Sequence, residues 1–143
     1  MRDEYIKTDT NVLPHDWKLN LIAECYDGLY YLDVVTTKYR IYTGNTIGLG
    51  HQKEYQKRYK LCLNMLKEKK EMLSLVEIFN SSHSENYFYM DKIVRIFEKR
   101  ITIFETKKTI SIGLPLLAES IGFEKLYESI CLDIIVIIKS KED

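Results

Sequence analysis

The sequence predicts a single α+β domain in which an N-terminal antiparallel β-hairpin, or small sheet, packs against several α-helices. Three observations support this class: an Asp-Gly pair between two alternating apolar and polar runs, a long stretch with apolar residues at helical spacing, and a β-branched run near the C-terminus. The chain has 143 residues, of which 45% are hydrophobic. That is enough for one continuous core, whereas two domains would each be too thin, so we expect one domain over residues 1–143.

The first predicted element is the hairpin. Residues 17–25 alternate between apolar and polar, Asp27-Gly28 follows, and residues 29–36 are rich in tyrosine, leucine and valine. A two-residue turn at Asp-Gly places apolar side chains of both runs on one face, and a slip of one residue would destroy this agreement. Residues 38–43 continue the second strand or re-enter the sheet, because their β-branched and aromatic content favours extended structure.

Two helices are predicted next. Apolar residues recur at helical spacing from about residue 51 to residue 79, with no proline or glycine inside. Ser82 with Glu85 forms a capping-box pattern at the start of a second helix. Residues 101–104 either end this helix or form a short strand. The inward residues of this second helix are expected to be Met90, Ile93, Val94 and Phe97.

The C-terminal region is predicted to hold a short helix, a further helix and a strand. Pro115 suits the first turn of a short helix that Gly122 closes, and another helix opens near Phe123. Residues 130–138 are mostly apolar at odd and even positions alike and rich in β-branched side chains, which favours a central strand buried on both faces. The same run also fits a buried helix. The buried face of the short helix is expected to consist of Leu116, Leu117 and Ile121.

The charge of the chain is balanced, with 21 basic and 21 acidic residues. This excludes the strong basic bias of a dedicated duplex-binding domain. Seven basic and three acidic residues nevertheless lie between positions 51 and 71, and we interpret them as the solvated face of a helix. The basic residues are Lys53, Lys57, Arg58, Lys60, Lys67, Lys69 and Lys70.

Cysteine usage and hydropathy predict a cytoplasmic protein with no membrane span. Cys25, Cys62 and Cys131 are an odd number of widely spaced thiols among apolar neighbours, as expected for reduced cysteines packed in a core. The N-terminus begins with charged residues and contains no apolar signal core. The most apolar run, residues 130–138, is well short of the ~20 residues that cross a bilayer.

No pattern in the sequence predicts a metal ion, a cofactor or a catalytic group. His15, His51 and His83 lie far apart and form no ligand cluster. Glu24 and Asp33 would share a hairpin face, but strand surfaces routinely carry such carboxylates. We therefore expect the protein not to be an enzyme.

One segment, Gly44 to Gly50, could still bind an anion, because backbone amides before a helix can hold phosphate. It lacks the Gly-Lys-Ser/Thr of a P-loop. Asn45-x-x-Gly48-x-Gly50 resembles the acetyl-CoA loop of the GNAT acetyltransferases over six residues, and departs from it at the first position, where that family has Gln or Arg. The resemblance implies coenzyme A binding; a flexible strand-to-helix linker is the alternative that we prefer.

Tyrosine is over-represented, with seven of the 11 tyrosines between residues 26 and 59. Tyrosine offers a large contact area and a hydroxyl at low entropic cost, and it is enriched at interface hot spots. We expect a protein-binding surface on the hairpin and the basic helix after it. Its residues are predicted to be Tyr31, Asp33, Tyr39, Arg40, Tyr42, Lys53 and Lys57.

The expected function is a non-enzymatic inhibitor that binds a protein: an immunity or antitoxin-type protein that neutralises a toxin, or a protein that blocks a host factor. One alternative is nucleic-acid binding, with Tyr39, Arg40 and Tyr42 as stacking and phosphate contacts and the basic helix along the backbone. Another is a small transferase that binds coenzyme A or a nucleotide at Gly48 and Gly50. A helical bundle of the viral Bcl-2-like kind is a fourth, but the Asp-Gly hairpin argues against an all-α chain.

Overall fold

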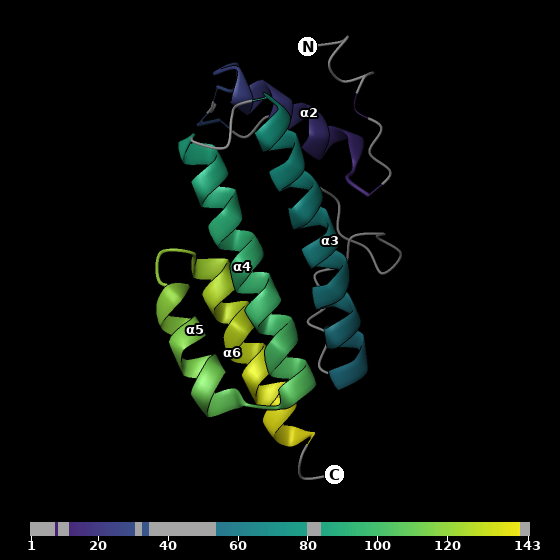
Figure 1. The fold of residues 1–143 in the computed structure, drawn as a ribbon, viewed down its shortest axis with the longest axis vertical. Helices are drawn as coiled ribbons and strands as arrows, with labels where there is room; N and C mark the ends of the chain where they lie inside the picture. Colours follow the sequence, from purple (N-terminus) through teal and green to yellow (C-terminus); the bar gives the residue numbers. More distant parts are fainter. Residues whose placement is uncertain (1–7, 9–11, 31–32, 35–53, 80–83, 141–143) are drawn as a thin grey trace.

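The computed structural model describes residues 8, 12–30, 33–34, 54–79 and 84–140, and this part of the chain is helical, with no strand in it. Figure 1 shows the helices, with colours that follow the chain from the N-terminus to the C-terminus. They are α2 (His15–Cys25), α3 (Tyr55–Phe79), α4 (Glu85–Thr106), a π-helical turn η1 (Thr109–Gly113), α5 (Leu114–Glu119) and α6 (Glu124–Lys139).

The helices form a bundle around α4. Helices α3 and α4 run antiparallel and make the most extensive contact (Figure 1). Helices α5 and α6 also pack against α4, α6 contacts α3 as well, and α2 crosses one end of α3. The sequence of α4 explains its central place, because apolar residues three or four apart form a stripe that faces the bundle. Five members of the stripe are buried: Met90, Val94, Phe97, Ile101 and Phe104.

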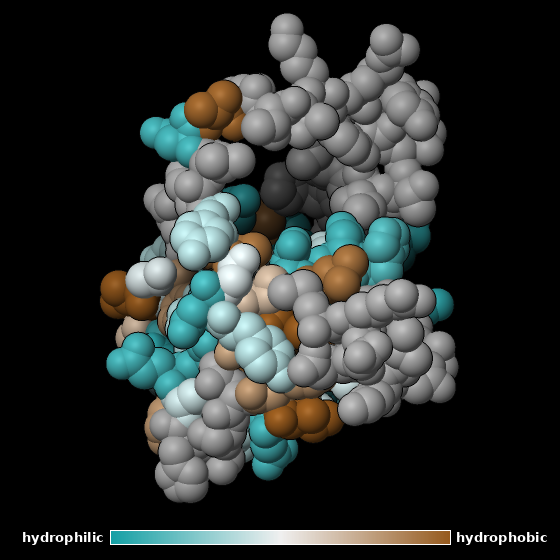
Figure 2. Space-filling view, turned by 90° about the horizontal axis from the view of Figure 1, so that it is seen from above, coloured by the Kyte–Doolittle hydropathy of each residue, from teal (hydrophilic) through white to brown (hydrophobic). Residues whose placement is uncertain are grey.

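The core lies where α3, α4, α5 and α6 meet. Its fully buried members come from all four helices, so it is continuous across the bundle. Among the described helices, none is long and apolar enough to span a bilayer. In the view of Figure 2, hydrophilic and hydrophobic patches alternate over the described surface. The buried cluster comprises Cys62, Ile96, Ile101, Ile103, Phe104, Leu116, Ile130 and Ile137.

The predicted N-terminal hairpin, and with it the α+β class, is wrong. Residues 15–25 form α2, which packs Ile22, with no exposed surface, toward the rest of the bundle and leaves Trp17 and Leu19 about 40% exposed. The apolar alternation was therefore overridden by helical burial against α3, since strand preference depends strongly on context. The hairpin was the argument against an all-helical bundle, and that argument no longer holds. Helix content alone, however, does not place the chain in any family.

The Asp-Gly pair ends α2 instead of joining two strands. Asp27 is in the left-handed region with φ +52°. The Gly28 N–H donates to the Ala23 carbonyl at 2.8 Å, and the Asp27 N–H donates to the Glu24 carbonyl at 3.0 Å. These two bonds form a Schellman motif, in which Asp27 is the residue with positive φ. A type I′ hairpin turn would also require positive φ at Gly28, which does not adopt it. Within the predicted second strand, residues 31, 32, 35 and 36 lie outside the described residues, as do residues 38–43.

The strand favoured for residues 130–138 is also wrong, and the helical alternative is correct. Ile130, Asp133 and Ile137 are at most 1% exposed, whereas Ile135 and Ile138 are nearly half exposed. Burial at spacings of three and four residues is the pattern of a helix with one face in the core. Residues 101–104 likewise continue α4 and form no strand.

Other predictions about the helices are confirmed, with two corrections. Helices α3 and α4 occupy the predicted regions, and Pro115 lies in the first turn of α5. The cap of α4 is Ser84, whose Oγ accepts from the Tyr87 N–H at 3.1 Å; the predicted cap, Ser82, lies outside the described residues. Leu116 is fully buried as predicted, but Ile121 is 72% exposed, because α5 ends at Glu119, before it.

Candidate functional site

The centre of the bundle contains a buried ion network in which two arginines share one aspartate. Arg58 of α3 donates from Nε to Asp133 Oδ1, and Arg100 of α4 donates from Nε to Asp133 Oδ2 at 2.7 Å. All three side chains are at most 5% exposed. The network joins α3, α4 and α6, and it holds one more positive than negative charge.

Ser129 and Cys62 complete the network. The Ser129 hydroxyl oxygen accepts from Arg58 Nη2 at 2.9 Å and from Arg100 Nη2 at 2.8 Å, and the Ser129 carbonyl accepts from Arg58 Nη2 at 2.7 Å. Arg100 Nη2 also lies 3.4 Å from Cys62 Sγ. Arg100 Nη1 is buried and has no hydrogen-bond partner among the described residues.

Burial keeps Cys62 in its thiol form. Desolvation is the largest cause and raises the Cys62 pKa to about 11, while Arg100 and Arg58 act in the opposite direction and Asp133 adds to the increase. A thiol with such a pKa is almost entirely protonated near neutral pH, and only the thiolate is a strong nucleophile. Cys25 and Cys131 are half-buried, and all three cysteines are unpaired, as the sequence predicted.

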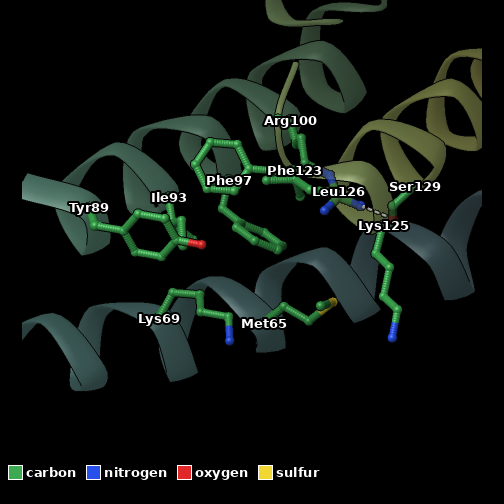
Figure 3. Close-up of a pocket in the computed structure, with 11 residues that line it drawn as sticks. Met65, Lys69, Tyr89, Ile93, Phe97, Arg100, Phe123, Lys125, Leu126 and Ser129 are labelled. Carbon is green, nitrogen blue, oxygen red and sulfur yellow. Dashed lines mark hydrogen bonds between the residues drawn. The ribbon is translucent and has the colours of Figure 1, made fainter. Parts of the chain in front are cut away.

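A cavity of about 450 Å³ lies against this network (Figure 3). Most of its lining is apolar or aromatic, and among the side chains that the structure describes it contains three basic residues and no acidic one. A hollow of this size and character suits an apolar group that carries a negative charge. The lining residues are Met65, Lys69, Tyr89, Ile93, Phe97, Arg100, Gly122, Phe123, Lys125, Leu126 and Ser129.

Helical spacing brings the lining residues together. Tyr89, Ile93 and Phe97 follow one another at intervals of four along α4, and Arg100 comes three residues later (Figure 3). Such spacing places side chains on one face of a helix. Met65 and Lys69 do the same on α3, and Leu126 and Ser129 on α6. The cavity is therefore the place where three helix faces meet.

Two aromatic contacts arrange the cations around the cavity. The Arg100 guanidinium lies 4.6 Å from the Phe97 ring centroid. The Lys69 ammonium lies 5.0 Å from the Trp17 ring centroid of α2, and burial lowers the pKa of Lys69. Both cations are thus partly removed from water, which strengthens their attraction for an anion.

The residues predicted to bind a partner do not line this cavity where the structure describes them. Asp33 is exposed, and Lys57 is exposed with its ammonium 2.8 Å from Glu54 Oε1. Gly44 to Gly50 also lie outside the described residues, so the anion-binding prediction stays a prediction. The other predicted site residues lie there too: Tyr31, Tyr39, Arg40, Tyr42 and Lys53.

Glu24 and Asp33 do not share a hairpin face, because Glu24 belongs to α2. No group of three His, Cys, Asp or Glu side chains in the described part of the chain could hold a metal ion.

Sequence reasoning missed the ion network. Its clearest signal was Asp133, a lone carboxylate inside the apolar run 130–138, because a charged group among buried residues needs a partner. Arg58 was assigned to a solvated face, yet it is only 4% exposed. The sequence could not indicate which of the 21 basic residues would meet Asp133, since Arg58 and Arg100 lie 75 and 33 residues away from it.

No protein-family model, curated protein or solved structure matches this chain.

Proposed function

We propose that the protein is a non-enzymatic inhibitor that binds a protein partner and seats a segment of that partner in the cavity between α3, α4 and α6. The observation that carries this proposal is the cavity itself: an apolar hollow whose described lining includes basic side chains and no acidic one. Its aromatic and arginine residues are of the kinds that dominate binding energy at protein interfaces.

The lining defines the chemistry of the segment. Phe97, Phe123 and Leu126 offer contacts to apolar side chains, and Lys69 and Lys125 favour acidic residues beside them. An amphipathic helix with an acidic edge combines these features, and grooves between helices commonly receive such segments. Whether the partner is a toxin or a host factor stays a prediction.

Two neighbouring aromatic residues of α4 provide a matched test. Tyr89 lines the cavity and Phe88 does not, and both are more than half exposed. We expect Tyr89→Ala to weaken binding of the partner at least about tenfold, which corresponds to the loss of an interface hot spot. Phe88→Ala should leave binding unchanged.

The measurement is co-purification of the tagged full chain from its native cells, followed by titration of the recovered partner with each variant. Equal affinity of the wild type and Tyr89→Ala would exclude the cavity as the interface. Failure to recover any protein that distinguishes the two variants would contradict the proposed function.

The nucleic-acid alternative is weakened by Arg58. The sequence predicts a ridge of Lys53, Lys57, Arg58 and Lys60 along the nucleic-acid backbone, but the Arg58 guanidinium is buried and bonded to Asp133 and Ser129. Lys57, a second member, is paired with Glu54. Phosphate contacts need exposed cations, so this ridge offers fewer than the sequence suggested.

A further inference from the structure

We propose that the cavity is also a binding site for a small amphiphilic carboxylic acid, whose carboxylate pairs with Arg100 and whose apolar body lies against Phe97, Phe123 and Leu126. The binding itself does not depend on a protein partner. One consequence, competition between the acid and the partner, rests on the function proposed above.

The first argument is the charge of the buried network. Arg58, Arg100 and Asp133 are each at most 5% exposed and together carry a net positive charge. Buried charges are costly unless they are paired, and the described residues provide only one carboxylate for two guanidinium groups. A carboxylate from outside would bring this network to neutrality.

The second argument is the open donor on Arg100. Its Nε donates to Asp133, and its Nη2 donates to Ser129 and approaches the Cys62 thiol, whereas its Nη1 has no partner in the part of the chain that the structure describes. An unpaired buried N–H is costly, and more so on a charged group, so a ligand that accepts from it removes part of this cost. A carboxylate suits the planar guanidinium fork better than a single-oxygen acceptor.

Arg100 Nη1 is covered by protein atoms, so the carboxylate reaches it through a small shift of a neighbouring side chain. Met65 is well suited to such a shift, since it lines the same cavity and its unbranched thioether adapts easily. The Phe97 ring stacks on the guanidinium and would remain in contact with the apolar body of the acid.

The third argument is the composition of the walls. The cavity volume of about 450 Å³ lies in the range of small-molecule sites, and most of the lining is hydrocarbon or aromatic. A small inorganic anion would gain the charge interaction but would bury no apolar surface. An uncharged alcohol would bury apolar surface but would leave the cations unpaired. An acid with an apolar body does both.

The test uses the full chain and three probes: decanoate, decanol and acetate. Isothermal titration should show binding of decanoate, with decanol and acetate at least about tenfold weaker, because each lacks one of the two interactions. In ¹⁵N-correlated NMR spectra, decanoate should move the Arg100 Nε–H cross-peak. Equal affinity for decanoate and decanol, or no binding of decanoate, would overturn the proposal.

A pair of substitutions on α4 gives the control. Arg100→Lys keeps a positive charge near Asp133 but removes the fork, and we expect it to weaken decanoate binding about tenfold or more. Lys99→Gln changes the adjacent exposed residue, which pairs with Glu119 outside the cavity, and should leave binding unchanged. Unchanged affinity in folded Arg100→Lys would refute the role of Arg100. If that variant does not fold, the wild-type NMR spectrum tests the role of Arg100: an Arg100 Nε–H cross-peak that does not move with decanoate would refute it.

The two proposals fail in different ways. Loss of decanoate binding with retained, Tyr89-dependent partner binding would refute only the acid site. Decanoate binding without any partner would refute only the inhibitor function. Displacement of the partner by decanoate, and not by decanol, would support both.

Discussion

At the scale of single residues, the ion network decides how the bundle is held together. Asp133 bonds to Arg58 and Arg100 through its two oxygens and so links three helices at one carboxylate. Replacing such a network with apolar residues need not destabilise a protein, but removing one member leaves uncompensated charge in the interior. Asp133 is therefore the most sensitive position of the network.

Asp133→Asn should destabilise the protein by about 3–5 kcal/mol, because it leaves two buried guanidinium groups without a counter-charge. Denaturant unfolding followed by circular dichroism measures this loss. Asp91→Asn is the control: it breaks an ion pair with the exposed Arg95, and it should cost less than about 1 kcal/mol. A smaller loss for Asp133→Asn than for Asp91→Asn would show that the network does not stabilise the fold.

Cys62 predicts a pH dependence in alkaline solution. Its folded-state pKa is about 11, above the ordinary value of 9.0, so between these values the folded state holds a proton that the unfolded state has released. Its contribution to stability is therefore complete below pH 9 and is lost as the pH rises, by at most about 1.4 kcal/mol per pH unit. Unfolding of the wild type and Cys62→Ala between pH 8 and pH 11 measures it: the stability difference should narrow only above about pH 9. A constant difference would contradict the raised pKa.

At the scale of elements, the caps show what local sequence could and could not reveal. Asp27-Gly28 signalled a turn, and Asp27, with its positive φ, ends α2 instead of joining two strands. The serine-rich stretch before α4 signalled an N-cap correctly, but the capping residue is two positions later than predicted, at Ser84. Such local signals specify a backbone conformation without specifying which elements meet there. That choice depends on packing against α3, which the local sequence does not contain.

Ser84→Ala should destabilise the protein by about 1 kcal/mol, because it removes the side-chain acceptor of the Tyr87 N–H at the start of α4. Thermal or urea unfolding measures the change. Ser74→Ala is a suitable comparison, since Ser74 is an exposed residue of α3 whose hydroxyl donates to the Lys70 carbonyl within the same helix. There the higher helix propensity of alanine should make the change neutral or slightly stabilising. A Ser84→Ala variant as stable as the wild type would rule out this cap.

At the scale of the whole molecule, the sequence indicated the long helices and missed the class. Uninterrupted apolar spacing identified α3 and α4, because long helices repeat their pattern over many turns. Residues 17–25 and 130–138 are short apolar runs, for which periodicity does not separate strand from helix. Their burial is decided by neighbours distant in sequence. The cavity was out of reach for the same reason, since it exists only where three helices meet.

Far-ultraviolet circular dichroism tests the helical class directly. The five α-helices found in the described residues alone cover more than half of the chain. The spectrum should therefore show the double minimum of a helical protein and lose it in one cooperative transition. A spectrum dominated by the single minimum of a β-sheet protein would contradict the helical fold.

The ion network also has a consequence for the order of folding. Helices α3 and α4 are neighbours in sequence and can pair early, because closing a short loop costs little entropy. Asp133 meets a residue 75 positions away, so its contacts are expected to form after the folding barrier has been crossed. Asp133→Asn should then accelerate unfolding and scarcely slow refolding in stopped-flow measurements; the reverse pattern would place Asp133 in the nucleus. The buried carboxylate would then lower the unfolding rate, and so lengthen the lifetime of the native state, without changing how fast that state forms.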